Sequence, residues 1–144
     1  CFCSPNSFHL NGDQCKAGHS NFTYDPFTLE GNFAFASAIQ EMLLQSHNGL
    51  IRIFPAAPQA WKDISFTNLR TEGAFLVSAT KQEGSIQSFS ITAPQGGIAR
   101  IRLPFPTYVI SKSAGIKQLN STDRTEILIQ FEKGGIVQIN NAFE

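Results

Sequence analysis

The first third of the chain carries carboxylates and imidazoles that could act as acids and bases. The candidate carboxylates are Asp13, Asp25, Glu30 and Glu41, and His9 lies near the first of them. Hydrolysis of a glycosidic bond requires two carboxyl groups across the sugar, one as an acid and one as a base or nucleophile. Glu30 is the best placed, because a group on a Gly-containing loop before a helix can project into a cavity. The alternative is that Glu30 only stabilises the helix N-terminus, by about 0.3–1 kcal/mol, and the residue types leave both interpretations open.

Polar side chains that could bind a substrate are dense in residues 1–25, which we predict to be loop-like. His9 and Asp13 are the candidates for substrate binding, because binding residues often lie on loops held by a scaffold. The alternative is a plain surface loop, since Pro5 and Asn11–Gly12 are good turn formers. Composition alone favours the surface loop.

The three cysteines, Cys1, Cys3 and Cys15, all lie near the N-terminal end. Their odd number argues against a disulfide framework, and together with His9 or His19 they match no strong zinc-binding spacing. One interpretation of Cys1 is that it begins a mature bacterial lipoprotein, since these proteins start with Cys. The alternative, which we favour, is that the numbering starts inside a larger gene product.

The sequence has no phosphate-binding loop and no dinucleotide fingerprint, so we expect neither a metal nor a cofactor.

One long helix, predicted over Phe33–His47, would position Glu30. We expect Asn32 to be its N-cap and Gly49 to provide the left-handed residue after its end. Its apolar residues recur at i, i+3, i+4 and i+7, which is typical of a helix with one buried face. These residues are Phe35, Ala36, Ile39, Met42 and Leu43.

The sequence that follows the helix reads almost entirely as β-structure. Alternating apolar residues bounded by Gly and Pro turns predict about seven short strands, which indicate a β-sandwich rather than βαβ units. We expect a turn at Gly84, a polar connection over Lys112–Thr122 and a turn at Gly134–Gly135. The fold class is therefore mainly β, with a C-terminal antiparallel β-sandwich preceded by one α-helix. Leu50–Phe54 is a short extended run before the predicted strands. The predicted strands are Phe66–Arg70, Ala74–Thr80, Ser85–Thr92, Ile98–Leu103, Thr107–Ser111, Thr125–Glu132 and Ile136–Asn140.

Charge and hydropathy exclude two classes of partner. Lys and Arg number 11 and Asp and Glu number 11, so no basic excess favours nucleic acid. No apolar run approaches the roughly 20 residues of a membrane span. Trp61 follows Pro55 and Pro58, and it has two interpretations: a hydrophobic plug between two domains, which we favour, or a platform on which a sugar ring stacks.

The segment PFTLEGNFAFASAIQEMLLQSHNGLIRIFPAAPQAWKDISFTNLRTEGAFLVSA, which starts at Pro26, resembles the C-terminal part of family 95 glycoside hydrolases of the α-L-fucosidase type. The family shares a Phe-x-x-acidic-Gly-Asn-Phe element, a helix ending in Met-Leu-Leu-Gln-Ser-His, Phe-Pro-Ala-x-Pro-x-x-Trp and a Leu-Arg-x-x-Gly-Gly/Ala-Phe strand. The joined order of these elements makes the resemblance fairly specific over residues 21–103.

The resemblance implies an (α/α)6 barrel catalytic domain followed by a β-domain. Residues 1–49 would be the end of that barrel, with an active-site loop and the last inner helix. Residues 50–58 would be a Pro-rich linker, and residues 59–144 the β-sandwich. The implied mechanism is inverting, and the implied partner in the complete enzyme is a carbohydrate with a terminal fucosyl or galactosyl group.

By match to the family motif, Glu30 is implied as a catalytic residue, with Asn32 beside it as a substrate-binding residue. This sequence has Glu where the fucosidases commonly have Asp, and Ala34 where they have Gly. The family's general acid lies far upstream of this motif and outside these 144 residues. We therefore expect a fragment that is inactive alone and acts as the accessory β-domain; the alternative is a carbohydrate-binding or structural β-sandwich module without catalysis. Export from the cell follows from the family only, and self-association through the exposed helix is a further expectation.

Overall fold

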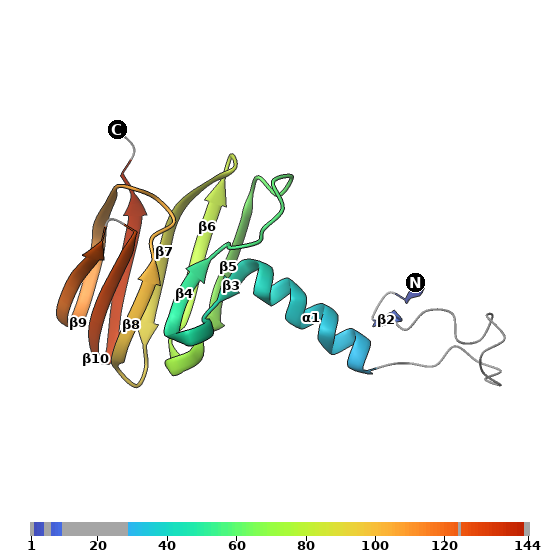
Figure 1. The fold of residues 1–144 in the computed structure, drawn as a ribbon, viewed down its shortest axis with the longest axis horizontal. Helices are drawn as coiled ribbons and strands as arrows, with labels where there is room; N and C mark the ends of the chain where they lie inside the picture. The colour runs from blue at the N-terminus through green and yellow to red at the C-terminus, as the bar shows by residue number, and fades with distance from the viewer. Residues whose placement is uncertain (1, 5–6, 10–28, 124, 143–144) are drawn as a thin grey trace. The chain divides into compact units, whose positions relative to one another are not determined.

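The computed structural model describes residues 2–4, 7–9, 29–123 and 125–142, with the side chains of residues 33–120 and 125–142 (Figure 1). The chain divides into two compact units, Cys1–Glu41 and Met42–Glu144. Each unit is described by itself below.

The first unit contains a short hairpin and most of one helix. Strand β1 (Phe2–Ser4) pairs antiparallel with β2 (Ser7–His9), so some of the segment predicted as loop is extended. Helix α1 covers Leu29–Leu43, four residues earlier at each end than the prediction. Within the described residues, no helix is long and apolar enough to cross a membrane.

Both errors in the predicted helix bounds have local causes. At the start, α1 includes Gly31, although glycine is unfavourable inside a helix by about 1 kcal/mol; Asn32 therefore lies inside α1 and is not its N-cap. At the end, Leu43 O accepts a hydrogen bond from Phe54 N at 2.7 Å. This bond satisfies a carbonyl that has no partner within the helix, and the chain then enters strand β3.

The second unit is one sheet of eight strands with the order β3-β4-β8-β10-β7-β6-β5, and β9 pairs with β10. All the pairs are antiparallel except β4 with β8, which is parallel. Two 3₁₀ turns, His47–Gly49 and Glu72–Ala74, precede β4 and β6. The mainly β fold class is thereby confirmed. The strands are β3 (Leu44–Gln45), β4 (Leu50–Ile53), β5 (Ile64–Arg70), β6 (Leu76–Gln82), β7 (Ser85–Ala93), β8 (Gly97–Arg102), β9 (Tyr108–Asp123) and β10 (Glu126–Asn141).

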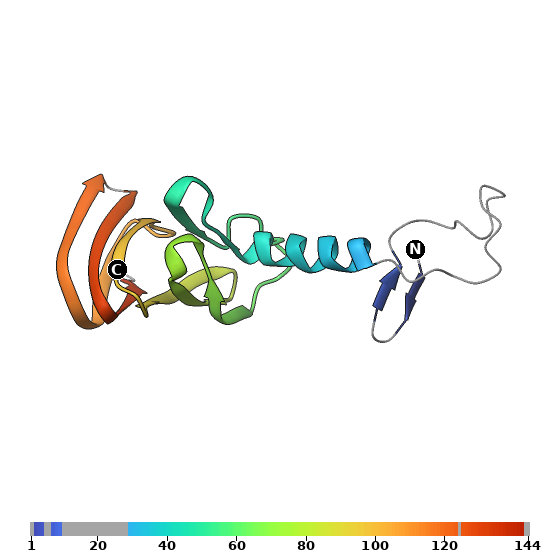
Figure 2. The same ribbon diagram turned by 90° about the horizontal axis from the view of Figure 1, so that it is seen from below.

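A bend in the long β9–β10 hairpin folds this sheet into two leaves (Figure 2). Residues 126–131 of β10 pair with β8, whereas residues 135–140 pair with β7. We call β3, β4, β8 and residues 126–131 the β8 leaf, and β5, β6, β7 and residues 135–140 the β7 leaf. At the bend, a Cβ added to Gly135 would lie 2.5 Å from Gly115 O. Only glycine allows the two backbones to approach so closely, so a single strand can serve both leaves.

Alternating apolar side chains from the two leaves form one core. Val77 and Ala79 on β6, and Ile127 and Ile129 on β10, are buried on the predicted faces. Three aromatic pairs connect the leaves or their adjoining loops, with ring centroids 5.1, 5.9 and 6.1 Å apart. Such pairs add about 0.5–1.5 kcal/mol each beyond area burial. They are Phe54–Phe66, Phe89–Phe105 and Phe75–Phe131.

Two predictions about the last third of the chain are wrong. Lys112–Thr122 is not a connection but most of β9, and Gly134–Gly135 is a bend within β10 rather than a turn between strands. The β9 sequence is polar because, among the strands that the structure describes, it pairs with β10 alone. Ile116 and Leu119 pack against the core from it, while most of its neighbours are exposed.

Candidate functional site

The residues predicted to carry chemistry lie in or near the first unit. The backbone of Glu30 and Asn32 lies in the first turn of α1, and His9 ends β2 opposite Phe2. Their side chains, and the whole of Asp13, lie outside the described residues. The catalytic and substrate-binding roles of these four residues therefore stay predictions. Among the residues that are described, no group of three or more His, Cys, Asp or Glu could hold a metal ion.

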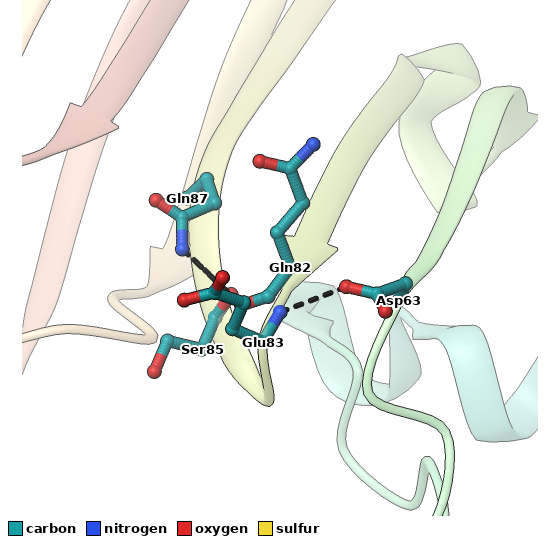
Figure 3. A pocket seen from close by; sticks show the side chains of 5 residues that line it. All are labelled: Asp63, Gln82, Glu83, Ser85 and Gln87. Atoms are coloured by element: carbon teal, nitrogen blue, oxygen red, sulfur yellow. Dashed lines mark hydrogen bonds between the residues drawn. The ribbon is translucent and has the colours of Figure 1, made fainter.

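A polar hollow lies beside the β6–β7 hairpin of the second unit (Figure 3). The hairpin turns through Glu83 and Gly84, which have φ angles of 50° and 82°. Two consecutive positive φ angles are those of a type I′ turn, for which glycine is favoured. The turn predicted at Gly84 is thus confirmed.

Lys62 and Asp63, the two residues before β5, hold this turn with two hydrogen bonds. Glu83 N donates to Asp63 Oδ1 at 2.8 Å, and Gly84 N donates to Lys62 O at 3.0 Å. The first bond supports a residue whose positive φ is unfavourable for an L side chain by about 1–2 kcal/mol. Asp63 therefore fixes the position of the Glu83 backbone, and Figure 3 shows its carboxylate directed at Glu83 N.

The hollow beside the turn has a volume of about 620 Å³ and a wholly polar set of side chains. Gln87 Nε2 donates to Gln82 O at 3.3 Å and to Ser85 O at 3.2 Å, which orients the Gln87 amide. Within the described residues of the chain, the Gln82 amide and the Glu83 carboxylate make no hydrogen bond. The lining residues are Asp63, Gln82, Glu83, Ser85 and Gln87.

Trp61 lies beside this hollow and is 37% exposed. Its own turn is closed by Trp61 N donating to Pro58 O at 3.0 Å and by Lys62 N donating to Ala60 O at 3.1 Å. A second open hollow of about 580 Å³ includes Trp61 and shares Asp63 with the first. Asp63 thus connects the hollow that includes Trp61 with the polar hollow of the β6–β7 hairpin. Sequence reasoning identified Trp61 but not the polar groups, because only the β5–β6–β7 pairing brings them together.

A second polar cluster lies on the outer face of the β8 leaf. The Glu126 side chain is 5% exposed, yet it lies between two half-exposed arginines, with Arg100 Nη2–Oε2 and Arg102 Nη2–Oε1 distances of 2.6 Å. Hydrogen bonds from Arg102 are the main cause that holds the Glu126 pKa below its ordinary value of 4.5, with Arg100 contributing and burial opposing. The register places Glu126 opposite Arg102. This cluster was not predicted, because the strand register is not visible in the sequence.

The chain is similar to known proteins over its β-region. The sequence model described as Glycoside hydrolase family 95, C-terminal domain matches residues 45–139. The chain is also 34% identical over 73 residues to Alpha-L-fucosidase 2 of Arabidopsis thaliana. That match covers 50% of this chain but only 9% of the plant protein. Because the family match spans β3 to β10, the chain belongs to glycoside hydrolase family 95 and carries its C-terminal domain.

Proposed function

We propose that this chain is the C-terminal region of a glycoside hydrolase resembling α-L-fucosidases and serves it as an accessory β-domain. The observation that supports this most directly is the family match over residues 45–139, together with the similarity to Alpha-L-fucosidase 2 of Arabidopsis thaliana. The substrate of the complete enzyme is a glycan with a terminal fucosyl or galactosyl group, and the reaction is inverting.

Glu30 is the catalytic carboxylate that this chain would contribute. Its backbone position in the first turn of α1 suits a group that projects from a helix N-terminus, and the helix dipole favours its ionised form. An inverting enzyme needs a second carboxyl group, about 6.5–9.5 Å away, as the acid. We infer that this acid comes from the barrel domain, with Asn32, Asp13 and His9 contributing to the substrate pocket. The chain alone is therefore inactive.

Hydrolysis of aryl α-L-fucosides and the corresponding galactosides by the purified chain tests this proposal. We expect no turnover above that of buffer, and the same result for Glu30→Gln. Turnover by the native chain that disappears in Glu30→Gln would refute it, since this would mean that both carboxylate roles are present here. Loss of turnover is assigned to Glu30 only where circular dichroism shows the variant to be folded.

A second candidate function is a carbohydrate-binding or structural module without catalysis. The half-exposed Trp61 favours the binding form, because an indole face suits the apolar face of a sugar ring. Oligosaccharide binding that is lost in Trp61→Ala but retained in Glu30→Gln would favour this function over an accessory role in hydrolysis.

Two further properties complete the proposal. We infer that the protein is exported from the cell, which fractionation of the source cells would test. We also infer that α1 supports self-association, because Phe33 on this helix is 68% exposed and exposed apolar surface favours association.

A further inference from the structure

We propose that the two adjoining hollows beside Trp61 form a binding site for neutral oligosaccharides. The site lies within the second unit, on the β6–β7 hairpin and the turn before β5. It needs no residue of α1 and no catalytic step. It deepens the second candidate function above, carbohydrate binding, and rests on it, whereas the hydrolysis of aryl α-L-fucosides tests the accessory role separately.

Trp61 supplies the apolar face of the site. Large apolar side chains of this unit are mostly in the core, whereas Trp61 keeps 37% of its surface exposed. The C–H groups of a sugar ring pack against such a face, while the sugar hydroxyls remain free for polar groups at the ring edge. Asp63 lines both hollows, so the hollow of Trp61 adjoins the one lined by the polar groups of the hairpin.

The polar groups offer both donors and acceptors for hydroxyl groups. The Gln82 amide has two donor hydrogens and an acceptor, the Glu83 carboxylate accepts, and the Ser85 hydroxyl does both. Figure 3 shows the Gln87 amide directed at the turn, where it donates to Gln82 O and Ser85 O, and the Gln82 amide extending away from the turn. Polar groups of this kind fix the orientation of a ligand and provide specificity.

The charges around the site favour a neutral ligand. Asp63 and Glu83 carry two negative charges, and Lys62 carries one positive charge. An anionic sugar would be repelled by this net negative charge. A neutral sugar can instead donate its hydroxyl hydrogens to the carboxylates, and hydrogen bonds to charged groups are stronger than those between neutral groups.

The backbone of the site is held in place before a ligand arrives. The bonds from Glu83 N to Asp63 Oδ1 and from Gly84 N to Lys62 O join the turn to the Trp61 segment. Preorganisation of this kind lowers the entropic cost of binding. The site therefore requires no rearrangement of the sheet.

The experiment uses the fluorescence of Trp61, because it is the only tryptophan of the chain. Titration of the full chain with fucosyllactose should give a saturable change in emission, and sialyllactose should bind at least about fivefold more weakly. Gln82→Ala should lower the affinity about three- to tenfold. It leaves the hydrogen bonds of the turn to Lys62 and Asp63 intact, because the Gln82 side chain makes no bond in the described structure. Val109→Ala, at an exposed position on β9, is the matched control and should bind like the native chain.

Calorimetric titration of Trp61→Ala provides the second measurement, since this variant has lost the reporter. It should lose at least about tenfold in affinity for fucosyllactose. The proposal is overturned by an emission change that does not saturate, by equal affinity for the two trisaccharides, or by native affinity in folded Gln82→Ala and Trp61→Ala.

Discussion

Gly134 and Gly135 are neighbours in β10, and each shows a different reason for glycine. Gly134 has a positive φ, whereas Gly135 allows two backbones to approach closely. Gly134 has a φ of +77°, but an added Cβ would meet nothing within 4 Å. A Cβ on Gly135 would lie 2.5 Å from Gly115 O and 2.9 Å from a ring carbon of Phe131. Conformational preference alone therefore ranks Gly134→Ala as the more harmful change, whereas the packing of the bend ranks Gly135→Ala as the more harmful.

The geometry gives the magnitude of both effects. A C···O contact is comfortable from roughly 3.3 Å, so Gly135→Ala must push the two backbones apart by about 0.8 Å. Overpacking costs about 1–3 kcal/mol, and we expect the upper end because a backbone oxygen cannot rotate away. Gly134→Ala should cost about 1 kcal/mol, the lower end for an L residue at positive φ.

Urea unfolding followed by circular dichroism measures the difference. With a denaturant slope of about 2 kcal/mol/M, the midpoint should fall by about 1.5 M for Gly135→Ala and by about 0.5 M for Gly134→Ala. Equal midpoints, or the reverse order with unchanged slopes, would refute the idea that close contact at the bend folds the sheet into two leaves.

Three further predictions concern other regions of the chain. The Glu126 pKa is lower in the folded state than its ordinary value of 4.5. The ionised Glu126 therefore stabilises the fold fully above pH 4.5, and this stabilisation is lost as the pH falls through the lowered pKa. Thermal melts of Glu126→Gln should show a lower melting temperature than the native chain at pH 7 and a smaller decrease of melting temperature on acidification. Glu83→Asn should raise stability by about 0.5–1 kcal/mol in urea unfolding, because Asn tolerates the positive φ of a type I′ turn. Light scattering should show a concentration-dependent increase in mass that Phe33→Ser reduces.

Each of these has a control and a contradicting result. Glu132→Gln is the control for the pH prediction, because Glu132 is an exposed carboxylate on the same strand; identical acid profiles of both variants and the native chain would contradict the role of Glu126. A Glu83→Asn variant less stable than the native chain would contradict the turn assignment. A constant monomer mass at all concentrations would contradict self-association, for which Val109→Ser serves as the control.

The fold class was predictable because the apolar residues that alternate in the sequence are buried together in the core of the folded chain. Val77 and Ala79, or Ile127 and Ile129, face the same core that their spacing indicated. The bend was not predictable, because two glycines in sequence indicate a turn as readily as a kink in one strand. Only the start of β9 was predicted, as part of Thr107–Ser111. The rest was missed because a border strand needs few apolar residues, and the polar segment before Glu126 therefore lacks the pattern of a strand.

The candidate site was likewise predictable only in part. Trp61 stands out in the sequence as a single aromatic residue after two prolines. The groups beside it come from residues 63 and 82–87, which are brought together by strand pairing rather than by sequence spacing. Glu30 and Asn32 were identified only through resemblance to a family, and their side chains lie outside the described residues, so their roles stay predictions.

The most direct measurement of the central claim is proton NMR of fucosyllactose incubated with the purified 144-residue chain. An accessory β-domain that lacks the general acid should leave the trisaccharide intact, with no free fucose signals after prolonged incubation. Appearance of free fucose with the native chain, and not with folded Glu30→Gln, would contradict the account, because this chain would then be a complete hydrolase.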